Sequence, residues 1–413
     1  MKKTIFLLVF LLHPFYVSAA TYYASPSGSI GNNGSRSAPF KFLQQAANIV
    51  KPGDTVIVEN GTYTDMDGDG IIVDMERSGA PSAWITFKAR NKWGAVLDGQ
   101  NNKSWCGVFF GAKASYYRFQ GFKITGTLYT GIEGSHGAHD LYFYANNVYR
   151  IGHLVTNNTN GAAGISINLG DNITIDSDII HDIGRIPHSA YTDSDYNHDQ
   201  GVYLRNNNNV TVMNNIFYNN FAGWGVHIYG GFASNVNIIG NTFAFPNPHR
   251  DGQIIIAEPT FNLFIAGNIF YKPANSAIRA DSCRKSVNLI LENNLTTAGS
   301  FDSDCRFLSS SNNLTNTDPL FVAPGSYDFH LRPGSPAIKA GLVWPGRVHD
   351  AYGNPLGSPP DAGGVAFQAS PRQLKKTPRR HNKATVKPSG ASGETWGEMV
   401  RTKMRELIRA IGE

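Results

Sequence analysis

The chain alternates short apolar segments with polar, asparagine-rich turns. Within the segments apolar side chains recur at every second residue, which is typical of β-strands with one buried face. One kind of segment begins at "GVFF" (107), "GIEG" (131), "GISI" (164), "GVYL" (201), "GVHI" (225), "QIII" (253) and "AIRA" (277). A second kind ends in Asn or Asp before an apolar pair, at Asn147, Asp178, Asn215, Asn241, Asn268 and Asn294.

The spacing of this pattern predicts the fold. The second kind of segment recurs after 31, 37, 26, 27 and 26 residues. A unit of about 25 residues with short strands and no helix predicts one coil of a parallel β-helix, an all-β solenoid whose stacked coils share one core. We therefore interpret the recurring Asn as structural, because Asn suits tight turns and its side chains hydrogen-bond along a stack.

Strand alternation predicts which side chains leave the core. In "GVYLR", Val202 and Leu204 should point inward, so Tyr203 and Arg205 point outward. Because stacked coils are in register, the outward residues of successive strands should form one face. The same reasoning assigns to this face Glu133, His227, Tyr229, Arg279 and Asp281.

The repeat is interrupted twice, and both interruptions precede strands of this face. The interval from 164 to 201 is 37 residues and that from 131 to 164 is 33 residues. Insertions in a repeat array collect on the binding face. We therefore expect a loop ending in "YNHDQG" to bring His198 and Asp199 beside Tyr203.

Both ends of the predicted solenoid resemble a known group of proteins. The segments are "YYASPSGSIGNNGSRSAPFKFLQQAANIVKPGDTVIVENGTYTD" near the start, and "DPLFVAPGSYDFHLRPGSPAIKAG" and "DAYGNPLGSPPDAGG" near the end. They resemble the secreted right-handed parallel β-helix superfamily of pectate lyases, alginate lyases and mannuronan C5-epimerases. The resemblance covers about residues 21–368 and implies that a short helix in "FKFLQQAANIV" caps the stack.

The predicted face suits proton abstraction beside a carboxylate. The resemblance implies an acidic, uronate-containing polysaccharide as the partner. Arg205 would pair with the uronate carboxylate, His227 or His198 would take the C5 proton, and Tyr203 or Tyr229 would protonate the leaving oxygen. The outcome is β-elimination by a lyase.

Other readings of the same face remain open. Proton return to the opposite face of the sugar would make the protein an epimerase, and "YNHDQG" is similar to the epimerases' His-Asp pair at His198 and Asp199. It lacks their Pro and leading Asp. A hydrolase would need two carboxylates across a groove, and it ranks lower because the centre of this face offers mainly Tyr, His and Arg. Non-catalytic glycan binding is a further alternative. Glu133, Arg279 and Asp281 are predicted substrate contacts in each case.

"DMDGDGIIVDME", from Asp65 to Glu76, has the spacing of an EF-hand calcium loop. Predicted strands flank it, whereas an EF-hand needs flanking helices. We interpret it as an Asp/Gly turn, with a structural Ca²⁺ held by Asp65, Asp67 and Asp69 as the alternative. No other cofactor is predicted.

The three cysteines suggest one cross-link. Cys283 and Cys305 lie 22 residues apart, about one coil, which places them within disulfide reach on adjacent rungs. Cys106 would then be a buried free thiol.

The ends of the chain carry its basic charge. Residues 1–20 resemble a secretory signal peptide, which predicts a secreted or periplasmic protein. Residues 371–413 hold 11 Lys/Arg against 4 Asp/Glu, whereas residues 21–370 hold 23 against 27. The mildly acidic body argues against a nucleic-acid partner. Residues 369–393 read as a disordered basic linker and 394–413 as an amphipathic helix that docks on a protein surface or lies on a membrane.

Overall fold

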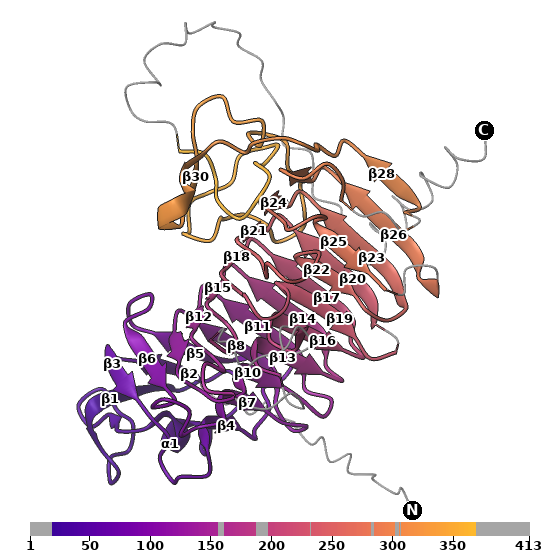
Figure 1. The fold of residues 1–413 in the computed structure, drawn as a ribbon. Coiled ribbons are helices and arrows are strands. Elements are labelled where there is room, and N and C mark those ends of the chain that lie inside the picture. Colours follow the sequence, from indigo (N-terminus) through magenta and orange to yellow (C-terminus); the bar gives the residue numbers. More distant parts are fainter. Residues whose placement is uncertain are drawn as a thin grey trace, which may run out of the picture.

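Three parallel sheets wind around one core in a computed structural model of the 413-residue chain (Figure 1). The structure describes residues 19–155, 161–186, 197–231, 233–281, 285–301, 305 and 307–368. The sheets have eleven, eight and nine strands. The predicted right-handed parallel β-helix is confirmed.

The eleven-stranded sheet runs the length of the stack (Figure 1). In spatial order its strands are β1 (Thr21–Ser29), β2 (Thr55–Val58), β5 (Ile85–Ala89), β8 (Ser115–Gln120), β11 (His139–Tyr144), β14 (Asp171–Asp176), β17 (Asn208–Met213), β20 (Ala233–Ile239), β23 (Thr260–Ala266), β26 (Val287–Glu292) and β28 (Ser309–Ser311).

The eight-stranded sheet contains the face predicted to be functional. Its strands are β4 (Ile71–Met75), β7 (Cys106–Phe110), β10 (Thr130–Gly134), β13 (Ala163–Asn168), β16 (Gln200–Arg205), β19 (Val226–Tyr229), β22 (Ile254–Ile256) and β25 (Ile278–Ala280).

The nine-stranded sheet closes each coil. Its strands are β3 (Gly61–Tyr63), β6 (Ala95–Asp98), β9 (Lys123–Thr125), β12 (Asn147–Tyr149), β15 (Ile179–His181), β18 (Ile216–Tyr218), β21 (Thr242–Ala244), β24 (Ile269–Tyr271) and β27 (Leu295–Thr296). Outside the three sheets lie α1 (Leu43–Ala47), η3 (Pro324–Ser326) and the antiparallel pair β29 (Phe321–Ala323) and β30 (Asp328–Leu331).

One coil visits the three sheets in turn, as β16, β17 and β18 illustrate. Two-residue corners separate these strands, and each begins with a left-handed Asn: Asn206 (φ 54°) and Asn214 (φ 57°). Asn reaches this conformation more readily than most residues because its side chain hydrogen-bonds locally. The return connection to the eight-stranded sheet is longer, and both sequence insertions fall in it.

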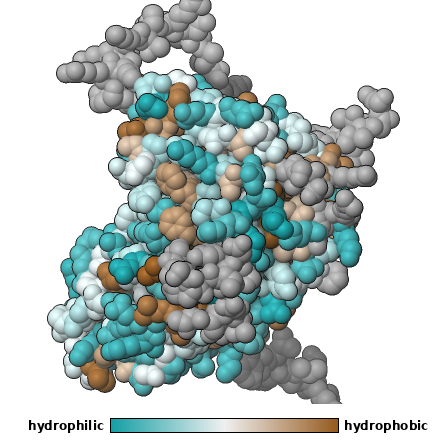
Figure 2. Space-filling model, viewed as in Figure 1, coloured by the Kyte–Doolittle hydropathy of each residue, from teal (hydrophilic) through white to brown (hydrophobic). Residues whose placement is uncertain are grey.

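The core follows the predicted alternation. Val202 and Leu204 of β16 and Val226 and Ile228 of β19 are fully buried, as is Ile278 of β25. Each coil adds apolar side chains to one continuous cluster, so burial of apolar surface is distributed along the whole stack. The surface seen in Figure 2 is largely hydrophilic, with apolar residues scattered over it.

A ladder of buried side chains follows the corner between the eleven- and nine-stranded sheets. In a typical rung, Asn241 donates from its backbone N–H to Asn268 Oδ1 (2.8 Å) and from Nδ2 to the carbonyl of Val212 (2.9 Å). The ladder consists of Asn146, Asp178, Asn215, Asn241, Asn268, Asn294 and Asn313. These bonds satisfy corner backbone groups that the strands leave unpaired.

The ladder position predicted at Asn147 is wrong by one residue. Ala145 occupies the left-handed position (φ 57°) and Asn146 follows it, as Asn215 follows Asn214. Asn147 opens β12 on the outer surface, where its Oδ1 lies 3.1 Å from His181 Nε2.

Asp178 is the one acid in this ladder. Its Oδ1 accepts the N–H of Asn146 (2.5 Å), but its buried Oδ2 has no hydrogen-bond partner in the described part of the chain. In the next rung, Asn215 Nδ2 donates to the carbonyl of Ile175. Phe143 pairs in register with Ile175, so the Phe143 carbonyl has the equivalent position beside Asp178. Burial raises the pKa of Asp178 well above its usual range. A protonated Asp178 would imitate Asn, so we expect the carboxyl to be neutral in the folded protein.

We predict that Asp178→Asn stabilises the protein increasingly as pH rises. The folded-state pKa lies above the unfolded value of about 3.9. The stabilising contribution of Asp178 is therefore complete below that value and lost as pH rises through the folded-state pKa. The variant keeps the hydrogen bonds without needing a proton and should gain about 1–3 kcal/mol near neutral pH. Urea unfolding at several pH values measures this, with the exposed Asp318→Asn as control. A pH-independent difference between Asp178→Asn and wild type would contradict the neutral carboxyl.

The C-terminal part of the described chain packs on the outer face of the nine-stranded sheet. Phe321, Phe329 and Leu331 join a second apolar cluster with residues of that sheet. Arg347 is buried and donates to Asn214 Oδ1 (2.7 Å) and the Gly363 carbonyl (2.9 Å). A Cβ at Gly240 would lie 2.3 Å from this guanidinium, so Gly replaces Asn at that corner.

At the other end, α1 is shorter than the predicted segment 40–50. It has five residues, and Leu43, Ala46 and Ala47 join the main core. The expected signal peptide lies almost wholly outside the described residues, as do the expected linker and C-terminal helix. None of the described helices has the length and hydrophobicity needed to cross a membrane.

Candidate functional site

A groove of about 770 Å³ lies on the outer face of the eight-stranded sheet. Strands form its floor, and residues just before the strands form one wall. Six residues predicted from the sequence line it: Glu133, His198, Tyr203, Arg205, His227 and Tyr229. Its other lining residues are Trp105, Tyr129, Thr130, Gly161, Ala162, Ala163, Ser166, Asn197 and Gln200.

The strand register sets the spacing along this floor. Tyr203 pairs with His227 and Arg205 with Tyr229 in adjacent coils. On the opposite side of β16, Tyr203 pairs with Ser166 of β13. Ser166 in turn pairs with Glu133 of β10. Adjacent coils are about 4.8 Å apart, so Tyr203 lies beside His227 and Arg205 lies beside Tyr229.

His227 lies in an aromatic enclosure at the groove floor. The centroid of its ring is 5.2 Å from Tyr203, 5.2 Å from Trp224 and 5.6 Å from Tyr229. Both ring nitrogens are buried, and neither has a hydrogen-bond partner among the residues that the structure describes. Burial, with a smaller contribution from His198, lowers the pKa of His227 to about 4. The imidazole is therefore neutral at neutral pH and keeps a free lone pair, as a base requires.

Tyr203 and Arg205 supply a proton donor and a cation beside this base. Burial raises the pKa of Tyr203, which keeps its hydroxyl protonated. The ring of Tyr203 stacks on Tyr229 at 6.2 Å. Arg205 is exposed and forms none of the ion pairs found among the described residues. Its guanidinium is thus available to a bound carboxylate.

The opposite end of the groove combines an acid with aromatic rings. Glu133 accepts a hydrogen bond from Thr130 Oγ1 (3.2 Å), and burial raises the pKa of its carboxyl. Trp105 and Tyr129 were not predicted as site residues. Each directly precedes a strand of the eight-stranded sheet, much as His198 precedes β16. That shared position is the signal from which they could have been found.

The catalytic role predicted for Asp199 is corrected. Asp199 does not line the groove and is fully buried. Its Oδ1 accepts from the Ala162 N–H (2.8 Å) and Arg185 Nη2 (3.0 Å), and its Oδ2 from Arg185 Nε (2.8 Å). The buried pair ties together the connections that precede β13 and β16. Asp199 therefore positions this wall of the groove and cannot reach a substrate.

Arg279 and Asp281, predicted to contact substrate, also lie outside the groove. They pair with each other at 2.9 Å and are 41% and 47% exposed. Arg279 is two coils from His227, and the buried Ile255 lies between them in register. The sheet continues past the groove, whereas the wall residues that make it concave do not.

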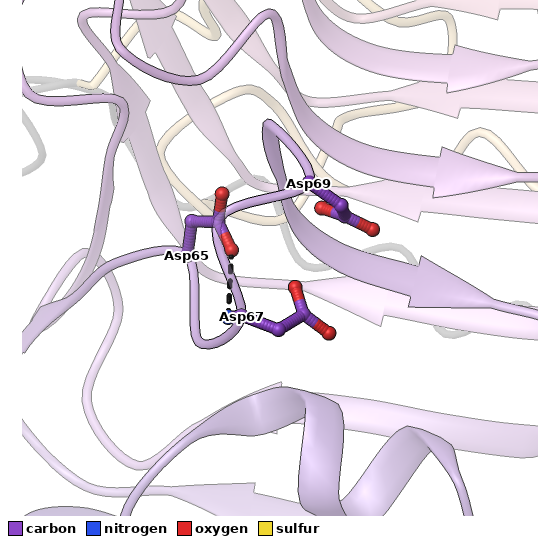
Figure 3. Close-up of side chains that lie close together, drawn as sticks. All are labelled: Asp65, Asp67 and Asp69. Carbon is purple, nitrogen blue, oxygen red and sulfur yellow. Dashed lines mark hydrogen bonds between the residues drawn. The ribbon is translucent and has the colours of Figure 1, made fainter.

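Asp65, Asp67 and Asp69 form a compact turn between β3 and β4 (Figure 3). Asp65 accepts the N–H groups of Asp67 (3.1 Å) and Gly70 (2.8 Å). Strands on both sides exclude an EF-hand, as the sequence indicated. One carboxylate oxygen from each Asp lies within 4.8 Å of the others. Oxygen ligands of this kind suit Ca²⁺, and binding of the ion here stays a prediction.

Of the two cysteines that the structure describes, one is disulfide-bonded and one is free. Cys305 is disulfide-bonded. Cys106 is a buried free cysteine, and burial raises the pKa of its thiol. Cys283, the expected partner of Cys305, lies outside the described residues.

Comparisons with known proteins agree with this architecture. Residues 22–253, more than half of the chain, match the family model described as "Pel9A-like, right handed beta helix region". Pectate lyase L of Dickeya dadantii (strain 3937) is 33% identical over 123 residues, which are 28% of this chain and 29% of that protein. The match thus spans less than a third of the curated relative.

Two solved structures are also similar. The crystal structure of pectate lyase Pel9A has 18% identity and a TM-score of 0.45, covering 84% of this chain and 96% of that one. Alginate lyase from Paenibacillus sp. str. FPU-7 has 17% identity and a TM-score of 0.47, covering 72% and 95%. On the family match over residues 22–253, the chain belongs to the Pel9A-like right-handed β-helix family.

Proposed function

We propose that this protein is a polysaccharide lyase that cleaves a uronate-containing polymer by β-elimination in the groove. The observation that carries the proposal is the neutral, unpartnered imidazole of His227 beside Tyr203 and the unpaired Arg205. This arrangement offers a base, an acid and a carboxylate-binding cation on two adjacent coils. The relative named pectate lyase L supports the same class of substrate.

The reaction assigns one task to each group. Arg205 pairs with the uronate carboxylate and makes the adjacent C5–H bond more acidic. His227 accepts the C5 proton, and its electron pair forms the C4–C5 double bond. The C4–O bond breaks, and the Tyr203 hydroxyl donates its proton to the departing oxygen. Tyr229 stacks on Tyr203 and holds the ring in place.

Substrate binding should strengthen the base. A pKa of about 4 makes free His227 a weak proton acceptor. A uronate carboxylate held by Arg205 places negative charge near the ring, and an opposite charge nearby favours the imidazolium. The groove thus keeps His227 neutral before binding and favours its protonation once the substrate is present.

We propose that the protein acts after export. The signal-like residues 1–20 support this location, and an acidic polysaccharide outside the cell is the expected partner. Docking by residues 394–413 on a protein or membrane surface stays a separate prediction.

We predict that His227→Ala lowers the rate of elimination by about 10²–10⁴-fold, the usual contribution of a general base. The ultraviolet absorbance of the unsaturated uronate product measures the rate on a panel of uronate polymers. His349→Ala, an exposed residue of the C-terminal segment, is the matched control and should keep full activity. Unchanged elimination by His227→Ala would remove this residue from the mechanism.

The pH dependence should separate the free enzyme from the substrate complex. We predict that kcat/KM keeps its value down to about pH 4 and then falls, because His227 must be unprotonated and its pKa is about 4. The acidic limb of kcat should lie at higher pH, because the bound carboxylate stabilises the imidazolium. Circular dichroism at each pH controls for unfolding. Coincident limbs near pH 6.5, the ordinary value for His, would contradict this account.

Arg205→Ala should act through the substrate carboxylate. We predict about a hundredfold lower kcat/KM on a free uronate polymer, comparable to the loss of one electrostatic donor. The loss should be much smaller on the same polymer after methyl esterification, because the ester carries no charge. Arg205→Lys should recover only part of the activity, since Lys lacks the bidentate geometry. Equal losses on both polymers would indicate a structural role for Arg205.

The same assays separate the alternatives. C5 epimerisation would incorporate deuterium from heavy water into the polymer without a gain in absorbance. Binding without deuterium incorporation or absorbance would leave a non-catalytic glycan-binding protein.

A further inference from the structure

The two ends of the groove differ in chemistry. Arg205, His198 and His227 give one end its cationic and basic groups, whereas Glu133, Trp105 and Tyr129 form the other. Among the described lining residues, Glu133 is the only acid and Arg205 the only Lys or Arg. A polymer lying along the groove therefore meets cationic and basic groups at one end and an acid with aromatic rings at the other.

These ends are too far apart to contact one sugar. In the outward column of the sheet, Glu133 is followed by Ser166, Tyr203 and His227 on successive coils. Three coil spacings amount to about 14 Å, which exceeds the length of a sugar ring. Different residues of the polymer must therefore lie at Glu133 and at His227.

Glu133 needs a hydrogen-bond donor from its ligand. Thr130 occupies one of its oxygens (3.2 Å), and the other has no hydrogen-bond partner in the described part of the chain. An ionised carboxylate only accepts hydrogen bonds. Sugar hydroxyls can donate to it, whereas a uronate carboxylate at this place would be another acceptor of the same charge.

The aromatic rings beside Glu133 favour an uncharged sugar as well. A Cβ at Gly70 (φ +91°) would lie 2.6 Å from Trp105 Cδ1, so the indole packs directly on that glycine. Phe109 supports it from the side, with ring centroids 5.8 Å apart. Rigid aromatic surfaces of this kind suit the apolar C–H faces of a neutral sugar ring.

Further negative charge lies beyond this end. Asp74 follows Glu133 in the same outward column, but Gln44 of α1 packs on it and burial raises the pKa of its carboxyl, so the charge that matters is that of the acidic turn. The acidic turn of Asp65, Asp67 and Asp69 (Figure 3) leads into Gly70. Trp105 packs on that glycine. A uniformly charged polyuronate would meet repulsion along this part of its path.

We propose, on the basis of the proposed lyase function, that the substrate is a heteropolysaccharide in which uronate residues are interspersed with neutral sugars. A uronate lies at Arg205 and His227, and a sugar without a carboxylate lies at Glu133 and Trp105. Glu133 is thus a specificity residue that rejects homopolymeric uronate.

Binding and turnover should be measured separately on three polymers. These are polygalacturonate, polymannuronate and a strictly alternating galacturonate–rhamnose polymer. Affinity is measured with the His227→Ala variant, and elimination with wild type. Both series are run with a chelator and with added Ca²⁺, because an ion at the acidic turn would change the local charge. We expect the alternating polymer to bind more tightly in every series.

Glu133→Gln tests the specificity residue directly. It keeps the shape and one acceptor but removes the charge, so we expect the affinity for the two homopolymers to rise by roughly tenfold. Affinity for the alternating polymer should change little. Glu292→Gln removes the same charge from a carboxyl that also accepts a hydroxyl hydrogen bond, but on β26 of the eleven-stranded sheet, and should leave all three affinities unchanged.

The outcomes distinguish this inference from the proposed function. Preferential binding of the alternating polymer without elimination would keep the inference and remove the lyase reaction. Elimination with equal or better binding of homopolymers would keep the lyase and overturn the inference, with or without Ca²⁺. Tight binding only of a polymer that carries amino sugars, or of no acidic polymer, would also overturn it.

Discussion

The in-register stacking of coils is the constraint on which the rest of the structure depends. A parallel strand has hydrogen-bond partners on both sides only if its neighbours keep the same register, and a shift by one residue would expose the core face. The Asn ladder fixes that register at one corner, where each side chain binds the backbone of the adjacent coils. Every coil therefore repeats the backbone position of the previous one and leaves its outward side chains free to differ.

This freedom explains how the repeated coils of the described chain can line a groove with different side chains. The outward positions of the eight-stranded sheet hold Glu133, Ser166, Tyr203, His227 and Ile255 on successive coils. Only the stretch walled by residues before the strands becomes a groove. The wall depends on the buried ion pair of Arg185 and Asp199. Such a pair is costly to bury but destabilising to break, so it holds the wall in one position.

The sequence revealed the features that depend on periodicity. Alternation alone predicted that Val202 and Leu204 point inward and Tyr203 points outward. With a two-residue period, the orientation of every side chain in a strand is fixed once one face is known to be buried. Asn147 was misplaced because the sequence offers two adjacent Asn and only the left-handed corner at Ala145 distinguishes them. The local sequence pattern therefore predicted the orientation of side chains in the strands, but it did not fix which residue occupies each corner position.

Features that depend on contacts between residues far apart in the sequence could not be predicted from the sequence. Asp199 stands in a polar loop and resembles a catalytic acid, but its partner Arg185 lies 14 residues away and draws it into the interior. The low pKa of His227 likewise arises from burial in an enclosure to which Trp224 contributes, three residues before it, together with Tyr203 from the preceding coil. Neither the composition of the chain nor the spacing of its residues predicts that these side chains enclose His227.

The neutral imidazole and the acidic far end of the groove follow from one physical principle. Both groups are partly removed from water, so each has few hydrogen-bond partners in the empty protein. At His227 this leaves a lone pair without a partner, and at Glu133 it leaves an acceptor with one oxygen unused. The two buried ring nitrogens of His227 cost free energy in the empty protein, and a ligand that supplies the matching partner recovers it. Under the proposed function, the groups along the groove match a polymer with a carboxylate near Arg205 and hydroxyl donors about three coils away.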